Sequence, residues 1–187
     1  VIGVSKLYCG AVEPGDVLRY HDRRAKDLPS HLLQFSADKK PVVVWNVTKQ
    51  CNLKCVHCYA KATAGPAPNE LTHEEGLALL RDFKDFGVPV VLFSGGEPLM
   101  RPDLFDLVDK TAALGMRAVI STNGTLIDRD MAKRLKDLGL SYVGISLDGT
   151  EPTHDKFRGQ PGAFAAAMAG VRNCQEAGLK VGLRFTV

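Results

Sequence analysis

The sequence predicts an α/β protein in which a parallel sheet curves into a closed or partly closed barrel. Strand-like and helix-like segments alternate regularly from about residue 41 to residue 187, the pattern of βαβ units with right-handed crossovers. Small or polar residues follow each of the first four strand-like segments, so functional groups gather at several strand ends. An open doubly wound sheet would concentrate them at one switch point, and the barrel is therefore favoured.

The strand-like segments are short, apolar and rich in β-branched residues. The first, PVVVWNV, is typical of a buried strand. In the last, alternate apolar residues share one face and the pattern stops without a turn, so we interpret the chain as a fragment truncated after about the fifth strand. The five segments are residues 41–47, 88–94, 116–122, 141–147 and 178–187.

Four segments have helical spacing of apolar residues. The first has a capping-box signature, Thr72 and Glu75, at its start and Gly87 as its stop signal. Cys174 lies close to the apolar stripe of the last helix, so a buried thiol is expected there. The helical segments are residues 71–87, 103–114, 128–138 and 163–177.

The composition argues against several classes of protein. The 187 residues are 45% hydrophobic and 24% charged, as in ordinary globular proteins, and the net charge of +3 is too small to indicate nucleic acid. No apolar run approaches the roughly 20 residues of a membrane helix. Five cysteines without a secretory signal favour reduced thiols and a cytoplasmic location. A loop-rich N-terminal leader, residues 1–40, precedes the α/β region, residues 41–187.

Three cysteines in CNLKCVHC, Cys51, Cys55 and Cys58, are the strongest chemical signal in the chain. Three thiolates from one loop suit an iron–sulfur cluster or metal that keeps one coordination position open. A structural zinc site is the alternative, with His57 or Cys9 as its fourth ligand, and the cysteines alone favour the cluster only about two to one.

The other strand ends offer groups that could bind a small molecule. Gly95 and Gly96 would let a ligand approach the backbone and its amide donors, and Glu97 is placed to accept from an ammonium group. Asn123 follows the third strand, and Ser146 and Asp148 the fourth. Taken alone, GGEP is better explained as an ordinary glycine turn, and the Asn-Gly and Asp-Gly pairs of the other two clusters are also common turn dipeptides.

The motifs CNLKCVHCY, GGEP, TNGT and SLDG, in this order on successive strand ends, resemble the radical S-adenosylmethionine (SAM) superfamily over residues 41–187. The resemblance implies a partial (β/α)6 TIM-like barrel. It also implies a 4Fe–4S cluster whose free iron binds SAM and cleaves it to a 5′-deoxyadenosyl radical.

Carried onto this chain, the family motifs assign a role to each matching residue. Cys51, Cys55 and Cys58 would bind the cluster, and His57 would pack near the adenine. The methionine ammonium would be held by Gly95, Gly96 and Glu97, and the ribose or carboxylate side would face Asn123, Ser146 and Asp148. Arg158 and Arg184 would pair with the SAM carboxylate or an anionic substrate, although for both a structural salt bridge is about as well supported.

The stretches VIGVSKLYCG and LPSHLLQFSADKKPVVVWNV are similar to radical SAM enzymes of alternative haem and haem d1 biosynthesis. This similarity implies a tetrapyrrole substrate, with removal of acetate side chains from didecarboxysirohaem, and a reductant such as ferredoxin or flavodoxin. Members usually continue into a cysteine-rich, SPASM-like C-terminal region, which is absent here, so the fragment itself could be inactive. A haem d1 propionate-removing enzyme, a peptide-modifying radical SAM enzyme and a non-enzymatic iron–sulfur or zinc module are the alternatives.

Overall fold

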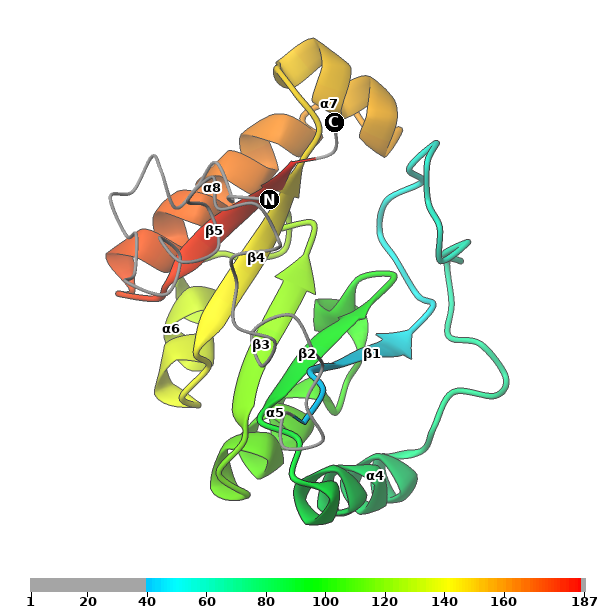
Figure 1. Cartoon of the computed structure of the whole chain (residues 1–187). Helices are drawn as coiled ribbons and strands as arrows, with labels where there is room; N and C mark the ends of the chain where they lie inside the picture. Colours follow the sequence, from blue (N-terminus) through cyan, green and yellow to red (C-terminus); the bar gives the residue numbers. More distant parts are fainter. Residues whose placement is uncertain (1–39, 186–187) are drawn as a thin grey trace, which may run out of the picture.

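The computed structural model describes residues 40–185, which form a five-stranded, wholly parallel sheet in the order β1-β2-β3-β4-β5 (Figure 1). The strands are β1 Val43–Thr48, β2 Val90–Gly95, β3 Arg117–Thr122, β4 Tyr142–Leu147 and β5 Val181–Phe185. Between them lie α4 His73–Phe86, the 3-10 turn η2 Pro98–Met100, α5 Leu104–Ala113, α6 Arg129–Asp137, α7 Glu151–Arg158 and α8 Ala163–Glu176. Each strand pairs with its neighbour in sequence, which confirms the predicted α/β fold of the partial-barrel type.

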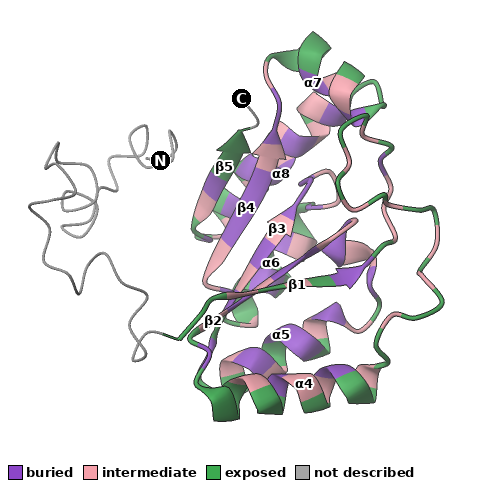
Figure 2. Ribbon diagram, turned by 45° about the vertical axis from the view of Figure 1, so that its right-hand side comes forward, coloured by how far each residue is buried: buried purple, intermediate pink, exposed green. Residues whose placement is uncertain are grey.

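The core lies between the sheet and the helices α4, α5, α6 and α8, which run along one of its faces (Figures 1 and 2). Alternate residues of the central strands point into it, among them Phe93, Ile120 and Ile145, none of which is exposed. Leu80 of α4 and Leu135 of α6 meet them from the helices and are also fully buried. The opposite face of the sheet is therefore left for the site.

Strand β1 differs from the buried strand that was predicted for residues 41–47. Val42 and Val44 are each 57% exposed, whereas Val47 is 1% exposed, so the strand is buried on one side only. The reason is its position: within the described residues β1 pairs with β2 alone, at the edge of the sheet. Its β-branched composition fits a half-buried edge equally well.

Of the five helices within residues 40–185, four agree with the prediction to within about two residues. The capping box of α4 is confirmed, because the Thr72 hydroxyl accepts from the Glu75 amide while the Glu75 carboxylate accepts from the Thr72 amide, and Gly87 ends the helix in the left-handed conformation. Cys174 is fully buried, as expected, and burial raises its pKa to about 11.

Helix α7 was not predicted. It has only eight residues, a proline in its first turn and mostly polar side chains, so no apolar period marks it in the sequence. Gly159 ends it in the left-handed conformation. Figure 1 shows it beyond the carboxyl end of β4, where it borders the site.

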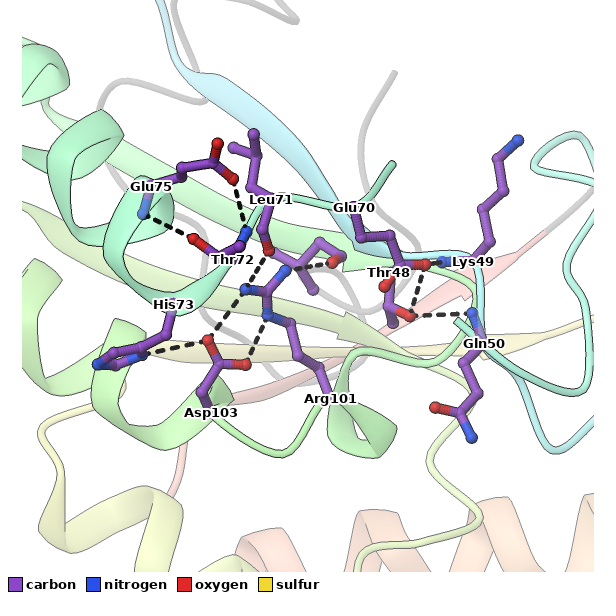
Figure 3. A network of polar contacts seen from close by, with 11 residues as sticks. Thr48, Lys49, Gln50, Glu70, Leu71, Thr72, His73, Glu75, Arg101 and Asp103 are labelled. Carbon is purple, nitrogen blue, oxygen red and sulfur yellow. Dashed lines mark hydrogen bonds and ion pairs between the residues drawn. The ribbon is translucent and has the colours of Figure 1, made fainter. Parts of the chain in front are cut away.

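A buried arginine ties the segment before α4 to the sheet (Figure 3). Arg101 is 6% exposed and donates hydrogen bonds to the carbonyls of Val47 and Leu71 and to the carboxylate of Asp103, which also contacts His73. Neighbouring Glu70 accepts from Thr48, Lys49 and Ala67. The cysteine loop runs from the end of β1 to the start of α4. These bonds hold it at both ends, near Thr48 and near Glu70.

The predicted leader and Cys9 lie outside the described residues. Within residues 40–185 no helix has the length and apolar character that crossing a membrane requires.

Candidate functional site

The three cysteines of the loop after β1 open on one cavity of about 400 Å³, on the sheet face that the helices leave free. Residues from all five strands or from the loops after them complete its wall, as the strand-end clusters predicted. The lining residues include Cys51, Cys55, His57, Cys58, Tyr59, Gly95, Gly96, Asn123, Ser146, Arg158 and Arg184.

Each of the three sulfur atoms accepts one hydrogen bond from the chain. Leu53 N–H donates to Cys51 Sγ at 3.4 Å, Ala62 N–H donates to Cys58 Sγ at 3.4 Å, and Arg158 Nη1 donates to Cys55 Sγ at 3.7 Å. Such donors stabilise a thiolate. In the absence of a metal, burial raises the pKa of Cys51, with its amide donor opposing that shift.

The positions of the three cysteines and His57 distinguish a site for a single metal ion from a site for an iron–sulfur cluster. Among the described residues no three His, Cys, Asp or Glu side chains are grouped closely enough to hold a single metal ion. His57, one of the two fourth ligands considered for zinc, instead packs against Phe157 with ring centroids 5.4 Å apart and lies 3.7 Å from Asp148. Three separate sulfur donors on one wall fit a cluster in which each binds its own iron.

The glycine pair joins the cysteine loop to β2 rather than presenting amides to a ligand. Gly96 N–H donates to the Thr48 carbonyl, and Glu97 N–H donates to the Gln50 carbonyl, each at 2.8 Å. A Cβ atom at Gly95 or Gly96 would collide with the backbone of the cysteine loop, and Gly95 has φ +137°. The backbone that approaches these glycines closely is that of the chain itself, and the Gly96 and Glu97 amides are used within the chain. The approach of a ligand to the two glycines stays a prediction.

Glu97 lies behind the cavity wall and is fully buried. Its carboxylate accepts hydrogen bonds from Thr122 Oγ1, Asn123 N–H and Leu99 N–H, at 2.8–3.1 Å. Burial raises the pKa of Glu97 to about 6, against these hydrogen bonds, which lower it. The carboxylate thus fixes the loop after β3 in place.

Asn123 and Ser146 face the cavity as predicted. The Asn123 amide donates to Asn52 Oδ1 at 2.8 Å, and Asn52 in turn donates to Thr125. The loops after β1 and β3 are therefore joined beside the cysteines. Asn52 was missed from the sequence, although its place directly after Cys51 was the available signal.

Arg158 and Asp148 form a buried ion pair next to the cysteines. Their Nε and Oδ2 atoms lie 2.7 Å apart, with the two side chains 10% and 1% exposed. Asp148 itself does not line the cavity, so its expected position facing a ribose is not what the structure shows. Arg158 lines the cavity, and its Nη1 donates to Cys55 Sγ.

Arg184 of β5 crosses the inner face of the sheet. It passes over Gly144 of β4, where a Cβ atom would lie 2.6 Å from its Nε, and its Nη1 donates to Ser121 Oγ of β3 at 2.7 Å. This bond holds a cation in the wall of the cavity, and a guanidinium there is suited to bind an anion.

The chain matches the family described as Radical SAM superfamily over residues 45–187. It is 67% identical over all 187 residues to Fe-coproporphyrin III synthase of Methanosarcina barkeri, covering 47% of that protein. It is 49% identical over 148 residues, 79% of this chain, to pre-heme d1 synthase of Dinoroseobacter shibae, covering 37% of it. AdoMet-dependent heme synthase of Oleidesulfovibrio alaskensis is 42% identical over 147 residues, 78% of this chain and 38% of that protein. The chain thus spans less than half the length of these relatives.

Solved structures show the same fold. The structure of anSMEcpe with bound AdoMet superposes with a TM-score of 0.61 at 21% identity, over 76% of this chain and 42% of that one. Streptococcus suis SuiB bound to S-adenosylmethionine gives a TM-score of 0.64 at 24% identity, over 76% of this chain and 32% of that one.

Proposed function

Because this chain belongs to the radical SAM superfamily, we propose that Cys51, Cys55 and Cys58 hold a 4Fe–4S cluster and that the cavity beside them binds SAM. One observation carries this assignment: all three thiols open on a single cavity that is shared with the Gly95-Gly96 turn, Asn123 and Ser146. An electron carrier would need the cysteines but no pocket of this size next to them.

Different residues of the cavity would bind different parts of SAM. The Gly95-Gly96 turn lines the part of the wall where the methionine end of SAM would bind, and His57 offers a ring for the adenine. The Glu97 carboxylate lies behind the wall with three hydrogen bonds, so it would support the methionine end of SAM by fixing the loop after β3, beside the Gly95-Gly96 turn where the ammonium would lie. Asn123 and Ser146 supply hydrogen-bonding groups for the ribose or carboxylate.

A 4Fe–4S cluster held by Cys51, Cys55 and Cys58 would supply the one-electron reduction that divides SAM into methionine and a 5′-deoxyadenosyl radical, and an external reductant such as ferredoxin or flavodoxin would provide that electron. The protein's part is to orient the cofactor and to keep water from the radical, for which a site inside the barrel mouth is suited.

The proposed substrate is a tetrapyrrole with carboxylate side chains. The similarity to Fe-coproporphyrin III synthase over the whole chain favours removal of two acetate side chains from didecarboxysirohaem, giving iron-coproporphyrin. Arg184 in the cavity wall is suited to bind one substrate carboxylate. The pre-heme d1 synthase relative supports a second candidate, removal of propionate side chains.

Product mass separates these candidates. Full-length protein, reconstituted without oxygen, is incubated with didecarboxysirohaem, SAM and dithionite, and the product is analysed by mass spectrometry. Loss of two acetate groups together with formation of 5′-deoxyadenosine supports the first candidate, and loss of propionate groups supports the second. If Cys51→Ala retains its iron and still cleaves SAM, the cluster assignment itself is wrong.

A further inference from the structure

We propose that Arg158 raises the reduction potential of the cluster through its hydrogen bond to Cys55, with Asp148 holding the guanidinium in place. The inference rests on the proposed cluster, and it assigns to α7 a role in setting the electronic properties of the metal centre.

The three thiols do not have equivalent donors. Cys51 and Cys58 accept from amides of their own loop, Leu53 and Ala62, which are neutral. Cys55 accepts from a guanidinium 103 residues further along the chain. One corner of the cluster would therefore face a positive charge and the other two would face neutral dipoles.

The guanidinium of Arg158 is held in position by Asp148, which contacts its Nε atom. Arg158 Nε lies 2.7 Å from Asp148 Oδ2, and the two residues are 8% and 6% exposed. Neither carboxylate oxygen of Asp148 has an aligned hydrogen bond within the described residues, so its interaction with Arg158 is chiefly that of an ion pair. His57 Nε2 also faces this carboxylate at 3.7 Å, and the Asp148 amide donates to Nδ1 of buried His154.

The end of α7 is docked on the cysteine loop through three further contacts. Val56 N–H donates to the Phe157 carbonyl at 2.9 Å, and the rings of His57 and Phe157 pack together. A Cβ atom at Gly159 would lie 2.6 Å from the Lys54 carbonyl, so glycine permits this close approach. Because residues on both sides of Arg158 are held against the loop, the contact with Cys55 follows from the fold and not from a free surface side chain.

The charge of Arg158 determines the direction in which it should shift the reduction potential of the cluster. Reduction adds one negative charge to the cluster, and hydrogen bonds to the ligating sulfurs are among the factors that set its potential. A nearby cation stabilises the reduced form more than the oxidised form, so it makes the potential less negative. Burial of the pair strengthens this effect relative to a surface charge.

The test compares Arg158→Gln and Arg158→Lys with the wild type in the reconstituted full-length protein, without SAM. The reduced cluster is quantified by electron paramagnetic resonance during a redox titration, and iron content and circular dichroism are recorded for each variant. Arg129→Gln is the matched control, since Arg129 forms an ion pair with Glu176 at 81% side-chain exposure.

For Arg158→Gln we expect full iron content but an approximately tenfold lower ratio of reduced to oxidised cluster at a fixed potential. For a one-electron couple this corresponds to a shift of about 59 mV to more negative values. Lysine keeps the charge without the planar donor fork, so Arg158→Lys should shift in the same direction by less, and Arg129→Gln should not shift.

Wild-type potentials in both Arg158 variants would overturn the inference while leaving the cluster assignment intact. If Arg158→Gln does not fold, a wild-type potential in Arg158→Lys overturns it equally. A wild-type protein that assembles no cluster would instead contradict the proposed function.

Discussion

At the residue scale, two features hold the backbone of the site in place: the absence of side chains at two glycines, and one buried carboxylate. Glycine at positions 95 and 96 brings the cysteine loop against the end of β2, and Glu97 holds the loop after β3. Both act on the shape of the cavity wall, and both give measurable predictions.

Replacing Gly96 with alanine should displace the cysteine loop, because the added Cβ would overlap the Gln50 and Lys49 carbonyls. We expect a loss of about 2–3 kcal/mol in the free energy of unfolding and a lower iron content after reconstitution. Gly65→Ala is the control, since no atom lies within 4 Å of its added Cβ. Equal stability and iron content in the two variants would contradict the proposed packing.

Glu97 should make the apo protein less stable as the pH rises from 5 to 7. Burial raises its pKa from 4.5 to about 6, so in this window the folded state binds a proton that the unfolded state has lost. The stabilisation is present below pH 4.5 and disappears above pH 6, which corresponds to about 1 kcal/mol between pH 5 and pH 7.

Urea denaturation at these two pH values, for wild type and Glu97→Gln, measures this contribution. Glu70 and Asp103 titrate below this range, because hydrogen bonds and the charge of Arg101 outweigh burial and lower the pKa of both. Burial lowers the pKa of His154 from 6.5, so His154 acts in the opposite direction within the range, and the difference between wild type and Glu97→Gln removes its contribution. An identical pH dependence in Glu97→Gln would show that Glu97 does not titrate there.

At the scale of elements, the hydrogen bonds of Arg101 join β1, the segment before α4 and the start of α5 (Figure 3). Arg101→Ala removes the donor of the Val47 and Leu71 carbonyls and leaves the Asp103 carboxylate with His73 as its remaining side-chain partner. We expect the free energy of unfolding to fall by about 3–5 kcal/mol. In Arg129→Ala, which removes an exposed ion pair, the change should stay below about 1 kcal/mol. Chemical denaturation of both variants checks the difference.

The sequence predicted the elements that carry an apolar period or a strong end signal. The capping box at Thr72 located α4 because both of its hydrogen bonds are local. It did not predict α7, which has no apolar period and is held by neighbouring segments: Asp155 accepts from the amides of Gly162 and Phe164, and the Phe157 carbonyl accepts from Val56 about 100 residues earlier. It also placed β1 in the interior, because β-branched residues suit both a central strand and an edge.

At the scale of the whole molecule, the candidate site draws on every strand, so ligand binding should stabilise the entire fold. For the reconstituted protein, SAM at 100 times its dissociation constant should add about 2.7 kcal/mol to the free energy of unfolding. A melting curve with and without SAM measures this. Protein carrying Cys51→Ala, Cys55→Ala and Cys58→Ala should show little or no shift, and an equal shift would place SAM away from the cysteines.

The candidate site was predicted in outline because parallel strands bring their carboxyl ends together, and so Gly96, Asn123 and Ser146 could be placed beside the cysteines. The direction of individual side chains could not be predicted in the same way. Asp148 and Arg158 pair with each other because a buried carboxylate needs a counter-charge, a constraint that only the packed structure reveals.

The sequential order of the strands has a consequence for protein synthesis. Within residues 40–185 each strand lies beside the one made just before it, so each of these strands finds its partner already present when it leaves the ribosome. The cysteines are made first, the glycine turn and Asn123 follow, and Arg158 and Arg184 come last. The cavity wall can therefore be assembled in the order of translation, and the two cations are added only after the thiols are in place.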